Sequence, residues 1–254
     1  MELTPMVFLI VCPLVFLAGL VDAIGGGGGL ISLPAYLIAG VPVHLAVATN
    51  KMSATFGTTL ATFRFIKAKL VDFKLALPTI VTAFIGSYLG ARLSMIVDEK
   101  VMKYILFVVL PVTAFIVLNR KLFEVEEKEG ELVITRKAMI LASISSLVIG
   151  VYDGFYGPGT GTFLIIALTV FCKLPMKKAN GQAKLINWTT NNTSLIVFLL
   201  HGQVLLLLGI VAAICNMAGA WIGSSLVMSK GAGIVRPCII LVLILLLLKV
   251  LGVY

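Results

Sequence analysis

Residues 19–29 read Gly-Leu-Val-Asp-Ala-Ile-Gly-Gly-Gly-Gly-Gly, and residues 150–161 read Gly-Val-Tyr-Asp-Gly-Phe-Tyr-Gly-Pro-Gly-Thr-Gly. Each stretch lies between two apolar runs, and Asp153 follows Asp22 by 131 residues. Five consecutive glycines cannot hold a regular helix against the entropy that glycine loses on folding. In so apolar a chain we expect both stretches to be breaks in membrane helices, a common place for ligand sites.

The composition predicts an all-α polytopic membrane protein. Hydrophobic residues make up 60% of the 254 residues, charged residues make up 12%, and the mean hydropathy is +1.11. So few polar side chains could not cover a globule in water, so the lipid bilayer is the expected solvent. A helix needs about 20 apolar residues to span it, which allows about eight to ten membrane segments.

The net charge of +9 does not indicate nucleic-acid binding. The Lys and Arg residues form short groups between apolar runs, as the positive-inside rule expects of a multi-pass protein. The sequence shows no paired carboxylates, no metal-ligand spacing and no nucleophile beside a base. We therefore expect no metal, no cofactor and no enzymatic activity.

The chain divides into two repeats, residues 1–118 and 138–254, joined by a polar connector at 119–137. After a two-residue insertion, an offset of 133 aligns Lys51 with Lys184 and Pro42 with Pro175. Each repeat holds five apolar segments. They lie at about 6–21, 30–39, 45–65, 75–96 and 101–118, then at 139–151, 163–171, 179–200, 205–228 and 234–251.

An odd number of crossings per repeat predicts that the second repeat is inverted. The charges agree, because 64–74 is basic while its counterpart 201–203 carries no Lys or Arg, and 173–178 is basic while 40–44 carries none. The group at 92–103 does not fit this pattern. Ten crossings place both termini outside and the connector in the cytoplasm; eight result if the short second segments re-enter instead.

The helix that follows each glycine break directs free N–H groups and a partial positive charge back at the break, which suits an anion. The alternative is that the glycines at the breaks only allow tight packing or a turn. Lysines inside membrane segments are costly and usually functional or paired. Alternatives for Lys51 and Lys184 are ion pairs with Asp22 and Asp153, or snorkelling to the headgroups. The predicted substrate-binding residues are Lys51, Lys184, Asn50, Gly26, Gly27, Gly28, Gly29, Gly157, Gly159, Thr160, Gly161, Asn187 and Asn191.

Asp22 and Asp153 have three candidate roles: taking up a coupling proton, capping the short helices, or neutralising the lysines. Small-residue pairs also align between the repeats, Gly86 and Gly90 with Gly219 and Gly223. Glycines four apart let membrane helices approach closely. They are expected to pack helices within the chain, and a homodimer through them is the alternative.

The stretch Gly19-Leu-Val-Asp22 with its glycines, followed by Ala48-Thr-Asn50-Lys51, resembles the TauE/SafE family of sulfite exporters. The second repeat resembles that family through Gly157-Pro-Gly159-Thr-Gly161 and the run from Ala179 to Lys184. The resemblance covers nearly the whole chain. It implies a multi-pass transporter of sulfite, organosulfonates or related small anions in a prokaryotic cell membrane. Ala183 stands where the first repeat has Asn50, which argues against a fully symmetric site.

The sequence therefore predicts a secondary transporter, an exporter of a small sulfur-containing anion, that works by alternating access between the two repeats. An anion channel with the same site is one alternative. A membrane subunit of a larger complex that transports nothing itself is the other.

Overall fold

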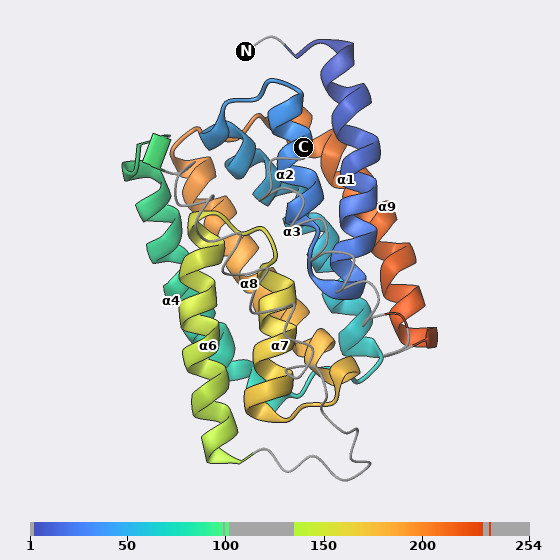
Figure 1. Ribbon diagram of the computed structural model, residues 1–254, viewed down its shortest axis with the longest axis vertical. Coiled ribbons are helices and arrows are strands. Elements are labelled where there is room, and N and C mark those ends of the chain that lie inside the picture. The colour runs from blue at the N-terminus through green and yellow to red at the C-terminus, as the bar shows by residue number, and fades with distance from the viewer. Residues whose placement is uncertain (1–2, 99, 102–134, 231–233, 235–254) are drawn as a thin grey trace.

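The computed structural model describes residues 3–98, 100–101, 135–230 and 234 (Figure 1). Within these residues the chain is helical and contains no strand, which confirms the all-α prediction for this part. The predicted fifth segment of each repeat and most of the predicted connector lie outside the described residues. The helices are α1 (Pro5–Gly25), α2 (Gly29–Ile38), α3 (Val43–Lys67), α4 (Phe73–Ile96), α6 (Arg136–Phe155), α7 (Thr160–Cys172), α8 (Met176–Leu200) and α9 (Leu206–Lys230).

Local sequence signals explain where several helices begin and end. The Asp72 side chain caps α4 by accepting hydrogen bonds from the N–H groups of Lys74 (2.8 Å) and Leu75 (3.2 Å). The Thr135 hydroxyl accepts from the N–H of Ala138 at the start of α6. Such caps satisfy N–H groups that have no partner inside the helix. At the other extreme, α1 stops because Gly26 adopts a left-handed φ of 78°, which suits glycine.

The two short helices double back instead of crossing the molecule (Figure 1). Helix α1 starts beside the N-terminus and runs inward, and α2 returns to the same end, here called the N-terminal end. Helix α6 starts at the opposite end, and α7 returns there. Helices α3 and α8 each run from one end to the other. Of the two crossing counts that the sequence left open, this part of the chain matches the re-entrant one.

The end opposite the N-terminus, here called the basic end, gathers the basic connections of both halves. It holds the α3–α4 connection at 68–72 and the α7–α8 connection at 173–175 (Figure 1). These are the two connections that the charge pattern placed on one side. Its described Lys and Arg residues are Arg64, Lys67, Lys69, Lys74, Arg136, Lys137, Lys173, Lys177, Lys178 and Lys230.

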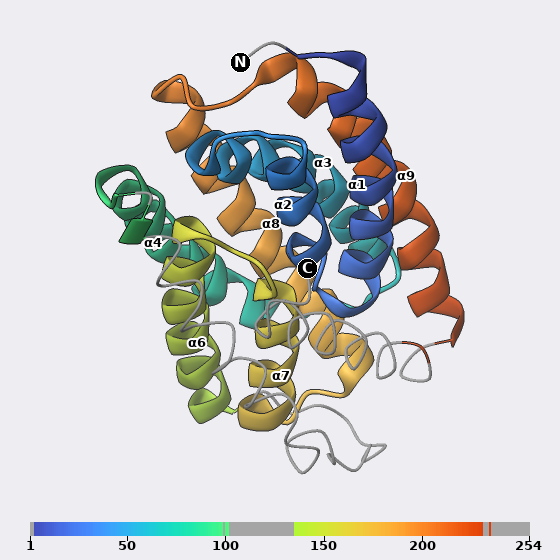
Figure 2. The ribbon, with the colours of Figure 1, turned by 45° about the horizontal axis from the view of Figure 1, so that its top comes forward.

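Helices from the two halves interleave. Helix α1 packs along α9, and α4 packs along α6, so the first helix of each half lies against the fourth helix of the other (Figures 1 and 2). Glycines make both contacts close. A Cβ atom on Gly90 would lie 2.0 Å from the carbonyl oxygen of Val151, and one on Gly219 would lie 1.9 Å from that of Phe16. Both glycine pairs are thus used within the chain.

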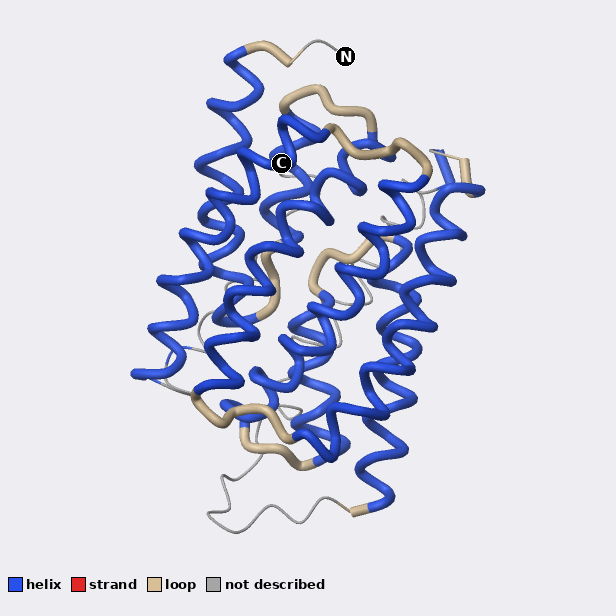
Figure 3. The backbone as a smooth tube through the Cα atoms, turned by 180° about the vertical axis from the view of Figure 1, so that it is seen from behind, coloured by secondary structure: helices blue, strands red, loops and turns tan. Residues whose placement is uncertain are grey.

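Apolar side chains form a core layer at each end. Near the N-terminal end, Val11 of α1, Tyr36 of α2 and Phe198 of α8 share one cluster. Near the basic end, Phe65 of α3 and Leu164 of α7 belong to another. The glycine breaks lie at mid-height between the two ends (Figure 3).

The outer surface is apolar, as a lipid-facing surface requires. Leu77 and Phe84 of α4 and Ile214 of α9 are among the exposed hydrophobic side chains. Four described helices are long and apolar enough to span a membrane: α1, α4, α6 and α9. Helices α3 and α8 are as long, but they carry the polar residues of the interior.

Replacing Gly90 with leucine should break the contact between α4 and α6. The new side chain would meet the backbone of α6, which cannot move aside without separating the helices, and we expect a loss of about 3 kcal/mol or more. Thermal denaturation in detergent, together with the yield of monodisperse protein, measures this. The control is Val81→Leu, which adds bulk on the exposed face of α4 and should change neither quantity.

Candidate functional site

The two glycine breaks, far apart in sequence, touch each other at mid-height in the molecule (Figure 3). The hydroxyl of Thr162 donates to the carbonyl oxygen of Gly25 at 2.6 Å, and the Thr162 N–H donates to that of Gly26 at 3.3 Å. A Cβ atom on Gly26 would lie 2.2 Å from the backbone of Gly161. Glycine is thus needed here for close approach as well as for the left-handed turn.

Two buried ion pairs cross between the halves at the breaks. Lys51 Nζ on α3 lies 2.8 Å from Asp153 Oδ2 on α6. Lys184 Nζ on α8 lies 2.6 Å from Asp22 Oδ2 on α1. The ion-pair alternative for the lysines is therefore present in the structure, with each lysine bound to the acid of the other half. The site is formally neutral while both pairs are closed.

Each acid also contacts the start of the short helix that follows it. The Gly28 N–H donates to Asp22 Oδ1 at 3.3 Å, and the Thr160 hydroxyl donates to Asp153 Oδ1 at 2.7 Å. A carboxylate in this position offsets the partial positive charge of a helix N-terminus. Both acids are thus ion-paired, and Asp22 also accepts a backbone N–H at the start of its short helix, whereas Asp153 accepts a side-chain hydroxyl there.

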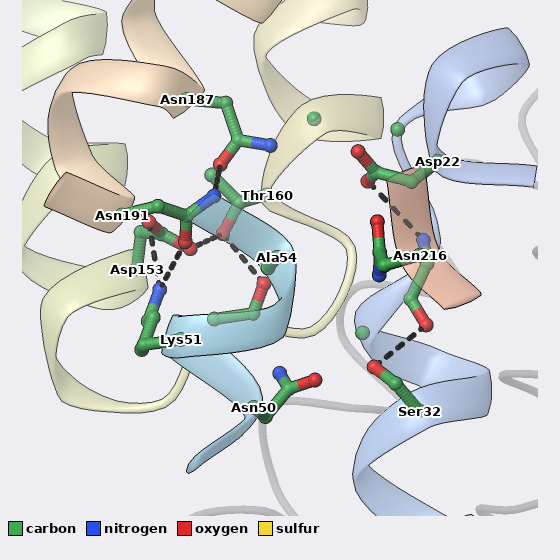
Figure 4. Close-up of a pocket in the computed structure, with 15 residues that line it drawn as sticks. Asp22, Ser32, Asn50, Lys51, Ala54, Asp153, Thr160, Asn187, Asn191 and Asn216 are labelled. Carbon is green, nitrogen blue, oxygen red and sulfur yellow. Dashed lines mark hydrogen bonds and ion pairs between the residues drawn. The ribbon is translucent and has the colours of Figure 1, made fainter. Parts of the chain in front are cut away.

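A small cavity of about 30 Å³ lies between the breaks and the middle of α3, α8 and α9 (Figure 4). That volume is enough for about two water molecules. The Lys51 ammonium, the starts of α2 and α7, and several carboxamides face it. The lining residues are Asp22, Gly26, Gly28, Gly29, Ser32, Asn50, Lys51, Ala54, Asp153, Gly157, Thr160, Gly161, Asn187, Asn191 and Asn216.

The carboxamides supply polar atoms that the protein leaves unused. Asn191 accepts a hydrogen bond from Lys51 at 3.0 Å and donates to Asn187 Oδ1 at 3.2 Å, which leaves the Asn187 amino group without a hydrogen-bond partner among the described residues. Asn50 is 7% exposed, and its Oδ1 atom has no hydrogen-bond partner among the described residues. Unpaired buried amides are unfavourable, so their collection at one cavity indicates a polar ligand.

Twelve of the fifteen residues proposed from sequence line this cavity, the two acids included. Three do not. Lys184 reaches it only through its ion pair with Asp22. Gly159 precedes α7 with a left-handed φ of 84°, so it shapes the turn. Gly27 accepts the N–H of Leu30 at the start of α2.

The cavity also includes Asn216, Ser32 and Ala54, which sequence reasoning missed. Asn216 comes from α9, in the middle of an apolar run, and the aligned residue of the first half is Ala83. No repeat signal could therefore point to it. The remaining signal was a lone amide in a membrane segment. Gly57 and Gly19 make room for its side chain. A Cβ atom on Gly57 would lie 1.8 Å from Asn216 Oδ1, and one on Gly19 would lie 2.9 Å from it.

Replacing Asn216 with alanine should weaken anion binding without unfolding the protein. The carboxamide is 6% exposed and faces the cavity, and one neutral hydrogen bond is worth about 1 kcal/mol, or roughly 5-fold in affinity. The KM for transport should rise by about that factor while the melting temperature stays the same. Asn192→Ala, which removes an amide of α8 that does not line the cavity, is the matched control and should change neither quantity. A lower melting temperature with an unchanged KM would make Asn216 a packing residue.

Several known proteins are similar to this chain over most of its length. The family model described as "Sulfite exporter TauE/SafE" matches residues 11–250. The chain is 37% identical over 227 residues to "Probable membrane transporter protein YfcA" of Escherichia coli (strain K12), covering 89% of this chain and 82% of that protein. It is 34% identical over 238 residues to "Probable membrane transporter protein ORF9" of Sinorhizobium sp, covering 93% and 89%.

A protein of Haemophilus influenzae (strain ATCC 51907 / DSM 11121 / KW20 / Rd), also named "Probable membrane transporter protein", is 34% identical over 227 residues, covering 89% of this chain and 87% of that protein. No solved structure gives a significant match. The relatives are named as transporters, none as an enzyme acting on a substrate. With a family model that spans most of the sequence and three such relatives, this chain belongs to the TauE/SafE family of membrane transporters.

Proposed function

We propose that this chain is a secondary exporter of a small sulfur-containing anion, such as sulfite or an organosulfonate, in a prokaryotic cell membrane. The observation that carries the proposal is the central cavity, where a buried lysine, unused carboxamides and two helix N-termini meet. The sulfur chemistry of the substrate is supported by the description of the family.

The donors around the cavity suit oxyanion oxygens. Helices α2 and α7 both begin at its wall, and the partial positive charge of a helix start attracts anions. Lys51 supplies a full positive charge. The amino groups of Asn50, Asn187 and Asn216 add neutral donors.

The ion pairs set a condition on binding. Because Lys51 is already neutralised by Asp153, an anion must replace a carboxylate as the partner of a lysine. Protonation of Asp153 or Asp22 would release the lysine and lower the repulsion between carboxylate and substrate. We therefore propose protons as the coupling ion, with these two acids as the groups that take them up.

We further propose that the two halves are inverted repeats that alternate access by rocking against each other. The opposite starting ends of α1 and α6, the exchanged pairing of α1 with α9 and α4 with α6, and the crossed ion pairs all support this. The cavity holds too little space for sulfite, so the halves must separate to load it. A closed, ion-paired site favours a carrier over a channel.

Sulfite counterflow in proteoliposomes tests the function. Vesicles preloaded with unlabelled sulfite should take up labelled sulfite faster than empty vesicles, since a carrier returns loaded more readily than empty. Unlabelled organosulfonates, sulfate and thiosulfate as competitors rank the substrates. Flux that is never trans-stimulated would indicate a channel, and no flux of any tested anion from folded protein would overturn the proposal.

A further inference from the structure

The duplication allows the two routes from the central site to the two membrane surfaces to be compared residue by residue. On α3, His44 and Val47 lie on the same helical face as Lys51, because seven residues make about two turns. On α8 the aligned residues are Lys177, Asn180 and Lys184. The residues on α3 lead from the central site to the N-terminal end, and those on α8 lead from it to the basic end.

The route toward the N-terminal end contains a cavity of about 140 Å³, lined by His44, Val47, Ser94, Met95, Phe198 and Gln203. Val47 is one turn from Lys51, and Phe198 is about two turns from Asn191 on the same face of α8. Apolar side chains lie beside this cavity on the side of the site, since Val47 belongs to a cluster with Phe155 and Tyr156 at the end of α6.

The equivalent route toward the basic end is closed by hydrogen bonds. Asn180, which replaces Val47, donates to the carbonyl oxygens of Ile24 (2.8 Å) and Ala23 (3.4 Å) in the last turn of α1. Lys177, which replaces His44, donates to the carbonyl oxygen of Met228 at 2.9 Å. Met228 is the counterpart of Met95, which lines the open cavity. The aligned positions that line a cavity in the first half thus make hydrogen bonds to neighbouring helices in the second.

Another cavity at the basic end does not lead to the site. It measures about 90 Å³ and is lined by Lys69, Asp72, Lys178 and Gln182, among others. Lys178 and Gln182 project from the side of α8 roughly opposite to Asn187 and Asn191, given 3.6 residues per turn. This cavity lies beside the α3–α4 connection, away from the route that Lys177 and Asn180 close.

Asn180 also carries a sign of a second state. It is fully buried, yet its Oδ1 atom has no hydrogen-bond partner among the described residues. A buried unpaired carbonyl oxygen is unfavourable. Separation of α8 from the last turn of α1 would expose this atom to water and relieve that cost.

We propose that Asn180 is the gate residue of the basic end. Its hydrogen bonds to the last turn of α1 hold that route closed, and the hydrogen bond of Lys177 to Met228 reinforces the closure. The route to the N-terminal end opens when the apolar side chains around Val47 separate. This inference rests on the proposed function and assigns its two gates: a polar one at the basic end and an apolar one at the other.

The test exchanges the aligned residues and measures access from each side. In a background that lacks Cys12, Cys172, Cys215 and Cys238, Ala54→Cys places a reporter thiol in the central cavity. A membrane-impermeant maleimide is added to oriented vesicles from one side at a time. We expect the parent to react about 10-fold faster from the N-terminal end. Asn180→Val should raise the rate from the basic end at least 5-fold.

Val47→Asn is the reciprocal variant and should slow labelling from the N-terminal end, so the test does not depend on the stability of Asn180→Val. Asn192→Val, which removes an amide bonded within α8, is the matched control and should change neither rate. Unchanged rates in both gate variants, with protein folded, would overturn the gate. Labelling needs no substrate, so changed rates without sulfite flux would retain the gate and reject only the proposed function.

Discussion

Replacing Lys51 with methionine should lower anion flux by about 100-fold or more. The ammonium is 2% exposed and is the cation that faces the central cavity. Removing one member of a desolvated charge pair costs about 2–5 kcal/mol, which corresponds to roughly 30- to 5,000-fold in binding. Initial rates of labelled sulfite uptake into proteoliposomes measure the effect, with Lys74→Met, an exposed lysine at the start of α4, as the control.

The single variant also leaves Asp153 without its partner, so stability must be measured in parallel. The double variant Lys51→Met with Asp153→Asn removes both charges of the pair and avoids a stranded carboxylate. We expect this variant to recover the melting temperature but not the flux. Recovery of both would mean that the ion pair is purely structural and would contradict a role in binding.

Replacing Asp153 with asparagine should separate anion binding from the proton gradient. The amide keeps an oxygen for the Thr160 hydroxyl but cannot take up a proton, and Lys51 loses the carboxylate that competes with the substrate. We expect the KM for sulfite to fall about 10-fold. The response of flux to a pH gradient imposed at a clamped membrane potential should weaken, since only Asp22 of the two proposed acids can then take up a proton.

Asp22→Asn is the matching variant in the other ion pair. Asp22 is more accessible than Asp153, with 19% of its side chain exposed against 2%, so the two variants need not respond equally. If the gradient dependence of both variants equals that of the parent, neither acid is the coupling site. The crossed pairs would then serve only to hold the halves together.

Much of the fold could be predicted because its signals are local. Five glycines in a row disfavour one continuous helix, and the aligned Asp22 and Asp153 mark the same break twice. The short second segments could not be assigned from sequence, since α2 has 10 residues and α7 has 13, lengths that suit either a buried or a re-entrant helix. Their direction depends on how the halves pack.

The residues of the site could be predicted in part, but which lysine pairs with which acid could not. Lys51 could pair with Asp22 in its own half or with Asp153 in the other, and spacing does not decide between them. The structure selects the crossed arrangement because α1 packs against α9 and α6 against α4, which interleaves the halves. Asn216 was missed for the same reason, since only tertiary packing brings α9 to the cavity.

The central claim is that one small anion binds at the cavity between the glycine breaks, on Lys51. Isothermal titration calorimetry of sulfite into the purified, detergent-solubilised chain tests this most directly. We predict saturable binding of one anion per chain, lost in the Lys51→Met, Asp153→Asn double variant while that variant stays folded. Equal sulfite affinity in the parent and the double variant would contradict the account.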